Sequence, residues 1–281
     1  MPKKKITVGI IGGTGQIGQW FKKFFQKNNC KVLIASRKTK LKPKDCAGIS
    51  DIVIITVPID ATLNVIKNIA PCVRKDALLM DLTSLKKEPV KAMLKFSNSS
   101  VVGAHPVFGP SVKTIKNQTV VLCKGRGDMW FKWLKNTLEK NKAKVKVTTP
   151  EKHDKMMAVI QGVIHFSSIT ISHTLKELGI SVKESKEFSS PVYKLRLDMV
   201  GRILNQDPKL YADIEILNTE SKKAITTYLK TSKRLLRIIQ NKNTPGFIKY
   251  FKEAGDYLGD FKKEAEEYSD YLIKKLIERK K

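Results

Sequence analysis

The chain has 281 residues, of which 41% are hydrophobic and 28% are charged, so it can bury a sizeable core and is expected to be soluble. No apolar run approaches the roughly 20 residues of a membrane-spanning helix, and the first residues lack the apolar segment of a signal peptide. These features argue against a membrane partner. Four scattered cysteines argue against a zinc site or a disulfide framework, so we expect no metal and a cytoplasmic location: Cys30, Cys46, Cys72 and Cys123.

The net charge of +28 raises the question of nucleic acid. The positive excess lies mainly in residues 1–150, where it is spread over single lysines with no basic block interleaved with aromatic residues. Two interpretations stay open: a general lysine-rich surface, or a field that draws small polyanions into a cleft. We expect no nucleic-acid partner.

The first predicted strand, residues 6–11, runs into a glycine-rich turn and then into a helical pattern at 19–25. Gly13, Gly15 and Gly18 fit G-x-G-x-x-G in the strand–turn–helix setting that dinucleotide binding requires. The first glycine makes the turn, the second lets the backbone approach a pyrophosphate, and the third lets the helix pack closely. The cofactor-binding residues expected here are Gly13, Thr14, Gly15, Gln16, Ile17 and Gly18.

The second predicted strand, residues 31–35, ends where an NAD-specific enzyme usually places an acidic residue that binds the ribose hydroxyl. Here Ser36, Arg37 and Lys38 follow, and no carboxylate occurs before Asp45. A hydroxyl and two cations suit a 2′-phosphate. The cofactor is therefore predicted to be NADP, with NAD less favoured.

Further strands alternate with helices, which predicts an α/β fold with an N-terminal Rossmann-type, doubly wound, mostly parallel sheet. Ligands in such sheets bind beyond the carboxyl ends of the strands. We therefore expect these strand ends to share one rim, and we add Val57 and Pro58 to the expected cofactor site. The remaining strands are predicted at 51–58, 77–82, 101–104, 119–123 and 143–147.

No strand is predicted after about residue 150, so we expect a dinucleotide-binding domain at 1–150 and an all-α C-terminal domain at 151–281. Residues 153–178 form a helical pattern that is apolar over most of its circumference, which is typical of a helix buried between domains or subunits. Further helices are predicted at 193–205, 208–240 and 246–279. Because this domain has more apolar surface than a small bundle needs to bury, we expect a homodimer through it.

Residues 103–110, GAHPVFGP, place His105 after the short apolar run of a predicted strand and before a loop punctuated by proline and glycine. This arrangement can deliver a reactive side chain from a buried strand to the edge of a cleft. The alternative is a strand-ending turn with an incidental histidine.

Together these pieces resemble the prephenate dehydrogenase family of tyrosine biosynthesis, over about residues 6–220. The resemblance rests on the glycine turn, on DLTSLK at 81–86, on GAHPVFGP, on His153-Asp154, and on RILNQDPKLYADI at 202–214. It implies an NAD(P)-dependent dehydrogenase that oxidatively decarboxylates prephenate to 4-hydroxyphenylpyruvate, with hydride transfer to the nicotinamide. His105 would accept the hydrogen of the ring hydroxyl, and Ser84 would hydrogen-bond both the histidine and the substrate.

The resemblance also implies substrate-binding residues in the helical domain. Arg202 would bind a substrate carboxylate, although Arg196 competes for that role, and Arg202 could be a helix-surface cation. His165 and Gln161 lie where relatives contact substrate, and Tyr211 replaces a tryptophan common in the family; His165 could equally be a core residue. We expect His153 and Asp154 to be a helix-start pair without direct chemistry, and His173 to be structural or exposed.

Departures from the family pattern leave the choice between prephenate and arogenate open. Pro110-Ser111 stands where many relatives have Thr-Glu, so this loop supplies no acid for the ammonium of arogenate, which favours prephenate. Alternatives are an arogenate dehydrogenase, another NADP-linked reductase of the deazaflavin type, and a redox-sensing nucleic-acid binder without turnover. No second α/β pattern follows residue 220, so no regulatory or mutase domain is expected within these residues.

Overall fold

A computed structural model describes residues 5–278; the expectation that residues 1–4 contain no signal-peptide features lies outside the described residues. The chain divides into two compact units. The first comprises Met1–Met157 together with Ala212–Thr219, and the second comprises Ala158–Tyr211 and Glu220–Lys281.

The first unit contains a seven-stranded sheet in the order β2-β1-β3-β4-β5-β6-β7. All neighbouring pairs are parallel except β5 and β6, which are antiparallel. The five strands from β2 to β5 therefore present their carboxyl ends at one edge, as the sequence predicted. The strands are β1 (Thr7–Ile11), β2 (Lys31–Ala35), β3 (Ile52–Ile55), β4 (Leu78–Asp81), β5 (Ser100–Pro106), β6 (Thr119–Arg126) and β7 (Lys144–Thr148).

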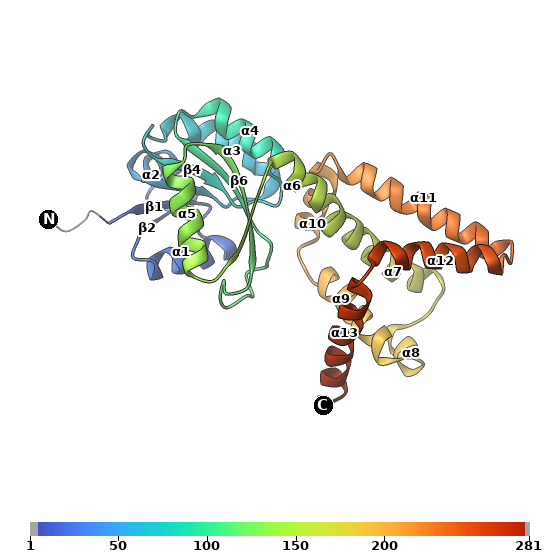
Figure 1. Cartoon of the computed structure of the whole chain (residues 1–281). Coiled ribbons are helices and arrows are strands. Elements are labelled where there is room, and N and C mark those ends of the chain that lie inside the picture. The colour runs from blue at the N-terminus through green and yellow to red at the C-terminus, as the bar shows by residue number, and fades with distance from the viewer. Residues whose placement is uncertain (1–4, 279–281) are drawn as a thin grey trace. The chain divides into compact units, whose positions relative to one another are not determined.

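Helices cover both faces of this sheet, which makes it doubly wound (Figure 1). On one face α1 and α5 bury an aromatic cluster that includes Phe21 and Phe25, and on the other α2, α3 and α4 bury an aliphatic cluster. The central strands are therefore buried on both sides, which explains their continuous apolar runs. The helices are α1 (Gln16–Lys27), α2 (Pro43–Ile49), α3 (Ile59–Ile69), the short 3₁₀ turn η1 (Ala70–Cys72), α4 (Lys87–Phe96) and α5 (Met129–Lys140).

The first unit extends past the expected boundary near residue 150. Helix α6 (Pro150–Met157) packs on α4, and its side chains His153 and Asp154 are buried in the first unit. The segment Ala212–Thr219 also belongs to this unit, where Ile214 packs with Ile59 and Leu85. These contacts of α6 and Ile214 place both segments in the first unit, although they follow the last strand of the sheet.

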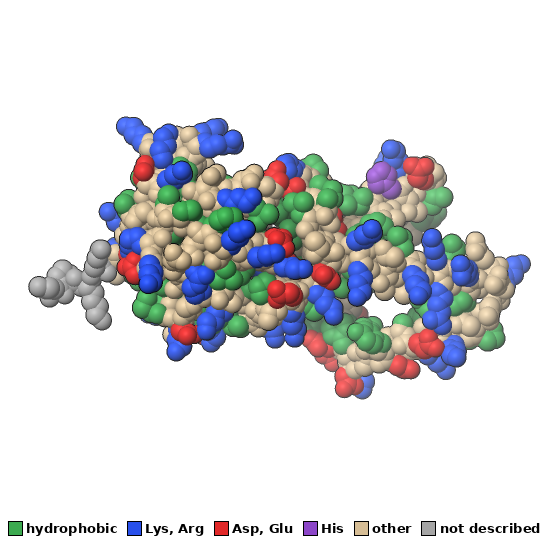
Figure 2. Space-filling view, turned by 90° about the horizontal axis from the view of Figure 1, so that it is seen from above, with side chains coloured by type: hydrophobic (Ala, Val, Ile, Leu, Met, Phe, Trp, Pro, Cys, Tyr) green, Lys and Arg blue, Asp and Glu red, His purple; other side chains and the backbone are tan. Residues whose placement is uncertain are grey.

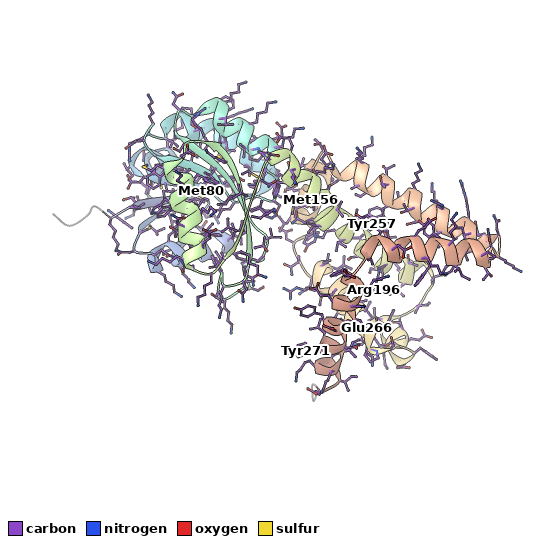
Figure 3. All side chains as sticks on the ribbon, viewed as in Figure 1. Met80, Met156, Arg196, Tyr257, Glu266 and Tyr271 are labelled. Atoms are coloured by element: carbon purple, nitrogen blue, oxygen red, sulfur yellow. The ribbon has the colours of Figure 1, made fainter. Side chains whose placement is uncertain are left out.

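Every described residue of the second unit that has regular secondary structure is helical (Figure 1). It begins with a π-helix, η2 (Ala158–Val163), which continues α6 and leads into α7. Within the unit α7 packs against α9, α11 against η2 and α12, and α13 against α9; Arg196 on α9 and Tyr271 on α13 are labelled in Figure 3. Its helices are α7 (Ile164–Glu177), α8 (Val182–Glu187), α9 (Pro191–Leu204), α11 (Ser221–Gln240), α12 (Thr244–Leu258) and α13 (Phe261–Glu278).

Two predicted helical segments are interrupted, and one helix was not predicted. Residues 208–240 divide into α10 (Pro208–Leu217) and α11, because Asn218 leaves the helix and its side-chain amide donates to the Asp154 carbonyl at 2.9 Å. Residues 246–279 divide at Gly259, whose φ of +54° ends α12. The short helix α8 is capped by the Ser181 hydroxyl, which accepts from the Glu184 N–H.

The surface is rich in lysine and arginine. In Figure 2 these cations are scattered over the visible face with acidic side chains between them, which favours a general charged surface over a single basic patch. No helix among residues 5–278 is long and apolar enough to cross a membrane. Within the same residues no group of three or more histidine, cysteine or acidic side chains is arranged to hold a metal ion.

Candidate active site

In the glycine turn between β1 and α1, the backbone atoms lie so close together that Gly13 and Gly18 leave no space for a side chain. A Cβ on Gly18 would lie 2.6 Å from the Cα of Gly13, and one on Gly13 would lie 2.9 Å from the carbonyl oxygen of Ile10. The glycine of this turn with left-handed backbone is Gly12, with φ of +81°. Gly13 is required instead for its close approach to β1 and β2.

The open side of this turn is suited to phosphate. Gly15 is the N-terminal cap of α1, and a Cβ there would meet only the Gly12 carbonyl, at 3.4 Å. The first turn of α1 contains no acidic residue, and its N–H groups point out of the helix end. The exposed side chains of Thr14 and Gln16 flank it, and Ile17 packs into the core below. These features fit the pyrophosphate of a nicotinamide dinucleotide.

The adjacent strand ends hold the other residues that were expected to bind the cofactor. After β2, the Ser36 hydroxyl accepts from the Lys38 N–H at 3.1 Å and the Ser36 N–H donates to the Thr39 hydroxyl at 2.8 Å, so the loop is ordered by its own side chains. Arg37 and Lys38 are both exposed. After β3, Val57 lies against Gly12, and Pro58 caps α3.

His105 lies inside β5, which is longer than predicted. The strand runs through Pro106 because it pairs with β6, with His105 opposite Val121. The side chain is only 3% exposed. The loop that follows is fastened to α1, since the Trp20 indole N–H donates to the Val112 carbonyl at 2.6 Å and its ring lies 5.2 Å from that of Phe108. The histidine and the glycine turn are thus connected within one unit.

A second histidine contacts His105, so the His153-Asp154 pair, which was expected to lie at a helix start without direct chemistry, lies beside the candidate base. The Nδ1 atom of His105 lies 2.9 Å from Nε2 of His153, and Nδ1 of His153 lies 2.7 Å from Oδ1 of Asp154. The two imidazole rings meet edge to face, with centroids 5.1 Å apart. The contact spans 48 residues of sequence, so no local pattern indicates it.

The surroundings of His105 keep it neutral. Burial is the largest cause that lowers its pKa well below the usual value, followed by electrostatic interaction with His153 and with Lys86. A buried neutral imidazole has one ring nitrogen free to accept a proton, which is what a general base requires.

Lys86 is a buried residue of the site that residue-by-residue reasoning missed. Its ammonium group and the Asp81 carboxylate form an ion pair in which both side chains are fully buried, and Asp81 also accepts from the N–H and hydroxyl of Thr83. This network fixes the segment between β4 and α4. Ser84 lies in that segment, half-buried, and within residues 5–278 no hydrogen bond joins it to His105.

The remaining predicted residues belong to the second unit. His165 on α7 is buried, and its ring lies 4.4 Å from that of Tyr211. Burial raises the pKa of Tyr211, and the nearby charge of Arg202 opposes that shift. Arg202 is exposed on α9. Gln161 lies in the π-helix, and its side-chain oxygen is buried without a hydrogen-bond partner in the described part of the chain.

Comparison with known proteins identifies the family to which both parts of the chain are similar. The prephenate dehydrogenase nucleotide-binding domain family matches residues 28–147, and the prephenate dehydrogenase dimerization domain family matches residues 149–253. A probable arogenate/prephenate dehydrogenase of Methanocaldococcus jannaschii is 39% identical over 97% of this chain and 66% of its own length. The T-protein of Haemophilus influenzae is 33% identical over 94% of this chain and 70% of its own length.

Among solved structures, prephenate dehydrogenase from Aquifex aeolicus, crystallised with hydroxyphenyl propionate and NAD⁺, has the same fold: the TM-score is 0.72 at 21% identity, covering 92% of this chain and 98% of that one. The dinucleotide turn together with the match to a nucleotide-binding domain and to curated dehydrogenases indicates a nicotinamide-dependent oxidoreductase as the class. With the sequence matches above, the chain belongs to the prephenate dehydrogenase family, whose members are NAD(P)-dependent oxidoreductases that act on cyclohexadienyl substrates.

Proposed function

We propose that this protein catalyses the NADP-dependent oxidative decarboxylation of prephenate to 4-hydroxyphenylpyruvate in tyrosine biosynthesis. The observation that carries the proposal is His105, a neutral imidazole buried in the strand next to the one that leads into Ser84, in the unit that also holds the dinucleotide turn. The bound nicotinamide would accept the hydride from the ring carbon that carries the hydroxyl.

In this reaction His105 is the group that moves the proton. Its free ring nitrogen accepts the hydrogen of the substrate hydroxyl as the adjacent carbon loses hydride, and the ring carboxylate then leaves as carbon dioxide. The same proton can return to the oxygen once the ring is aromatic. Ser84, at the end of the neighbouring strand β4, would donate to or accept from the substrate hydroxyl and keep it directed at His105.

The substrate is a dianion, and we assign its further contacts to the second unit. Arg202 is an exposed guanidinium that can bind a carboxylate through two parallel hydrogen bonds. The adjoining rings of His165 and Tyr211, which are tilted 52° to one another, offer an apolar surface with polar edges. We also assign Gln161 to substrate binding, because its side-chain oxygen is buried without a hydrogen-bond partner. A rotation of the amide by 180° would present its NH₂ group, a hydrogen-bond donor, to a substrate oxygen instead.

The preference for NADP over NAD is assigned to the loop after β2. The Ser36 hydroxyl and the exposed Arg37 and Lys38 supply one hydrogen-bond donor and two positive charges for a 2′-phosphate. No acidic side chain lies within this loop to repel that phosphate or to bind a free ribose hydroxyl.

We further propose a homodimer formed through the second unit. The support is the dimerization-domain match over residues 149–253 and the large apolar side chains that the second unit leaves exposed. The cytoplasmic location stays a prediction.

A turnover assay tests the proposed reaction. The purified protein is mixed with prephenate or with arogenate, and with NADP or with NAD, while the absorbance of the reduced cofactor is followed. The highest kcat/KM is expected for prephenate with NADP. Turnover of arogenate alone would replace the substrate assignment with arogenate dehydrogenase, a preference for NAD would overturn the role of the β2 loop, and turnover of neither substrate would overturn the reaction itself.

A further inference from the structure

Three buried side chains in the first unit form one hydrogen-bonded row. His105 is 3% exposed, His153 is 1% exposed and Asp154 is 5% exposed. The row runs from Nδ1 of His105 to Nε2 of His153 at 2.9 Å, and from Nδ1 of His153 to Oδ1 of Asp154 at 2.7 Å. Only the Nε2 atom of His105 remains outside it.

The Asp154 carboxylate is held as an acceptor. Its Oδ1 atom accepts from the Lys86 N–H at 2.8 Å, and its Oδ2 atom accepts from the Lys87 N–H at 3.0 Å. These N–H groups belong to the N-cap residue and the first residue of α4, where the helix dipole also favours negative charge. The Asp154 carbonyl in turn accepts from the Asn218 side-chain amide at 2.9 Å, which fixes this turn of α6.

The direction of the row follows from counting hydrogens. A carboxylate can only accept, so the Nδ1 atom of His153 carries a hydrogen and donates it to Asp154. A neutral His153 then has an unprotonated Nε2 atom, which can only accept from His105. The hydrogen of neutral His105 therefore resides on Nδ1, and its Nε2 atom has a free lone pair.

We propose that His153 and Asp154 are positioning residues that hold His105 in the tautomer with an unprotonated Nε2 atom, ready to accept the substrate proton. Neither residue touches the reacting atoms; each acts through the hydrogen bond that it makes to the next ring. The kinetic consequence rests on the proposed role of His105 as the base, but the tautomer itself is a property of the free protein. It can therefore be measured without turnover.

The direct test is the ring ¹⁵N NMR spectrum of the free protein at neutral pH, with His105 assigned by comparison with His105→Asn. In the wild type we expect a protonated Nδ1 atom and an unprotonated Nε2 atom on His105. In Asp154→Asn we expect the amide oxygen to keep the bond from the Lys87 N–H and the amide nitrogen to face His153, at the loss of the bond from the Lys86 N–H. The amide then donates to His153, which reverses both hydrogen bonds of the row and moves the hydrogen of His105 to Nε2. A wild-type His105 with a protonated Nε2 atom, or an Asp154→Asn protein with an unchanged tautomer, would overturn the proposal.

Kinetics supply the second readout. Asp154→Asn is expected to lower kcat by about 10² to 10⁴-fold, as tautomer reversal does in other histidine-based sites, with the dissociation constant for the cofactor unchanged. The loss should be the same throughout the neutral and alkaline range, because it does not arise from protonation. His153→Gln, whose amide oxygen can still accept from His105, should retain more activity than His153→Leu.

Two controls separate positioning from folding and from failure of the proposed function. Asp128→Asn removes an exposed carboxylate that pairs with Lys124, and it should change neither spectrum nor kcat. If Asp154→Asn does not fold, the pair His153→Gln and His153→Leu decides the matter, and equal activities in these two variants would overturn the proposal. If the wild type turns over neither substrate, the proposed function fails while the NMR result still decides the tautomer.

Discussion

At the scale of single residues, the chemistry depends on how His105 is surrounded. It is buried within β5, which is the largest influence on its pKa, and the electrostatic effects of His153 and Lys86 also oppose a positive charge on the ring. All three influences favour the neutral ring. The consequences for pH dependence and for cofactor choice can be tested one residue at a time.

The pH profile of kcat/KM should reflect the lowered pKa of His105. Only the neutral ring accepts a proton, so activity is lost as the pH falls through the pKa of the folded protein, which lies well below the ordinary value of 6.5. We therefore expect a profile that is flat from neutral pH through 6.5 and that declines only at more acidic pH. An acid limb centred at or above 6.5 would show that the ring is not desolvated as the structure indicates.

The preference for NADP should depend on Arg37. Loss of one charged hydrogen bond to a phosphate costs about 1.5–3 kcal/mol, so Arg37→Ala should raise the KM for NADP by roughly 10 to 100-fold. The KM for NAD should not change. The matched control is Lys44→Ala, which removes another exposed cation nearby on α2. An equal effect of both substitutions would assign the preference to overall charge rather than to this loop.

At the scale of elements, the glycine turn makes two separable demands. Gly18→Ala would force a Cβ to within 2.6 Å of the Gly13 backbone and push α1 from the sheet. We expect it to lower the free energy of unfolding of this unit by about 1–3 kcal/mol. Gly15→Ala is the control, because its Cβ meets only one atom, at 3.4 Å; it should leave stability nearly unchanged but weaken cofactor binding.

Urea unfolding and cofactor titration of the two glycine variants provide the measurements. If Gly15→Ala were as unstable as Gly18→Ala, the close packing of α1 on the turn would not be the reason for the third glycine. If Gly15→Ala bound the cofactor normally, the backbone approach proposed for the pyrophosphate would be wrong.

Strands and the glycine turn could be predicted from sequence because local pattern decides them. Residues 52–55 and 78–80 are short apolar runs of the kind that strands buried on both faces have, and both lie in the sheet. The breaks at Asn218 and Gly259 were not predicted, since one is fixed by a distant carbonyl and the other interrupts a strong helical pattern. Where the deciding contact is far away in sequence, local pattern contains no information about it.

The candidate site shows the same limit. His105 could be selected because a strand, a proline and two glycines surround it. His153 and Asp154 were assigned only to a helix start, because their contacts with His105 and with the N-terminus of α4 join residues 48 and 68 positions apart. The sequence did offer one signal for this contact. His153 and Asp154 both match the family pattern, and the start of a helix does not by itself require a histidine followed by an aspartate.

At the scale of the whole molecule, the helical segment 153–178 was expected to be buried, but several of its apolar side chains are exposed in the single chain. On η2 and α7 these include Val159 at 53%, Ile160 at 47% and Ile164 at 51%. We define Val159, Ile160 and Ile164 as the apolar face of the second unit. Its burial in a homodimer would explain why the helical pattern is apolar over most of its circumference.

A charge placed on this face should prevent dimer formation. Ile160→Lys is expected to give a monomer in sedimentation experiments at concentrations where the wild type is a dimer, because a buried interface does not tolerate an unpaired charge. The control is Ile49→Lys, which changes an isoleucine of similar exposure on the first unit. A wild type that sediments as a monomer, or an Ile160→Lys protein that stays dimeric, would contradict the proposed dimer surface.

The central claim is that His105 takes the substrate proton while the nicotinamide takes the hydride. Its most direct test is the kcat of His105→Asn with prephenate and NADP, together with the dissociation constant for NADP. We predict a fall in kcat of about 10² to 10⁴-fold with cofactor affinity unchanged, since a positioned general base contributes about this factor. A kcat equal to that of the wild type would contradict the account.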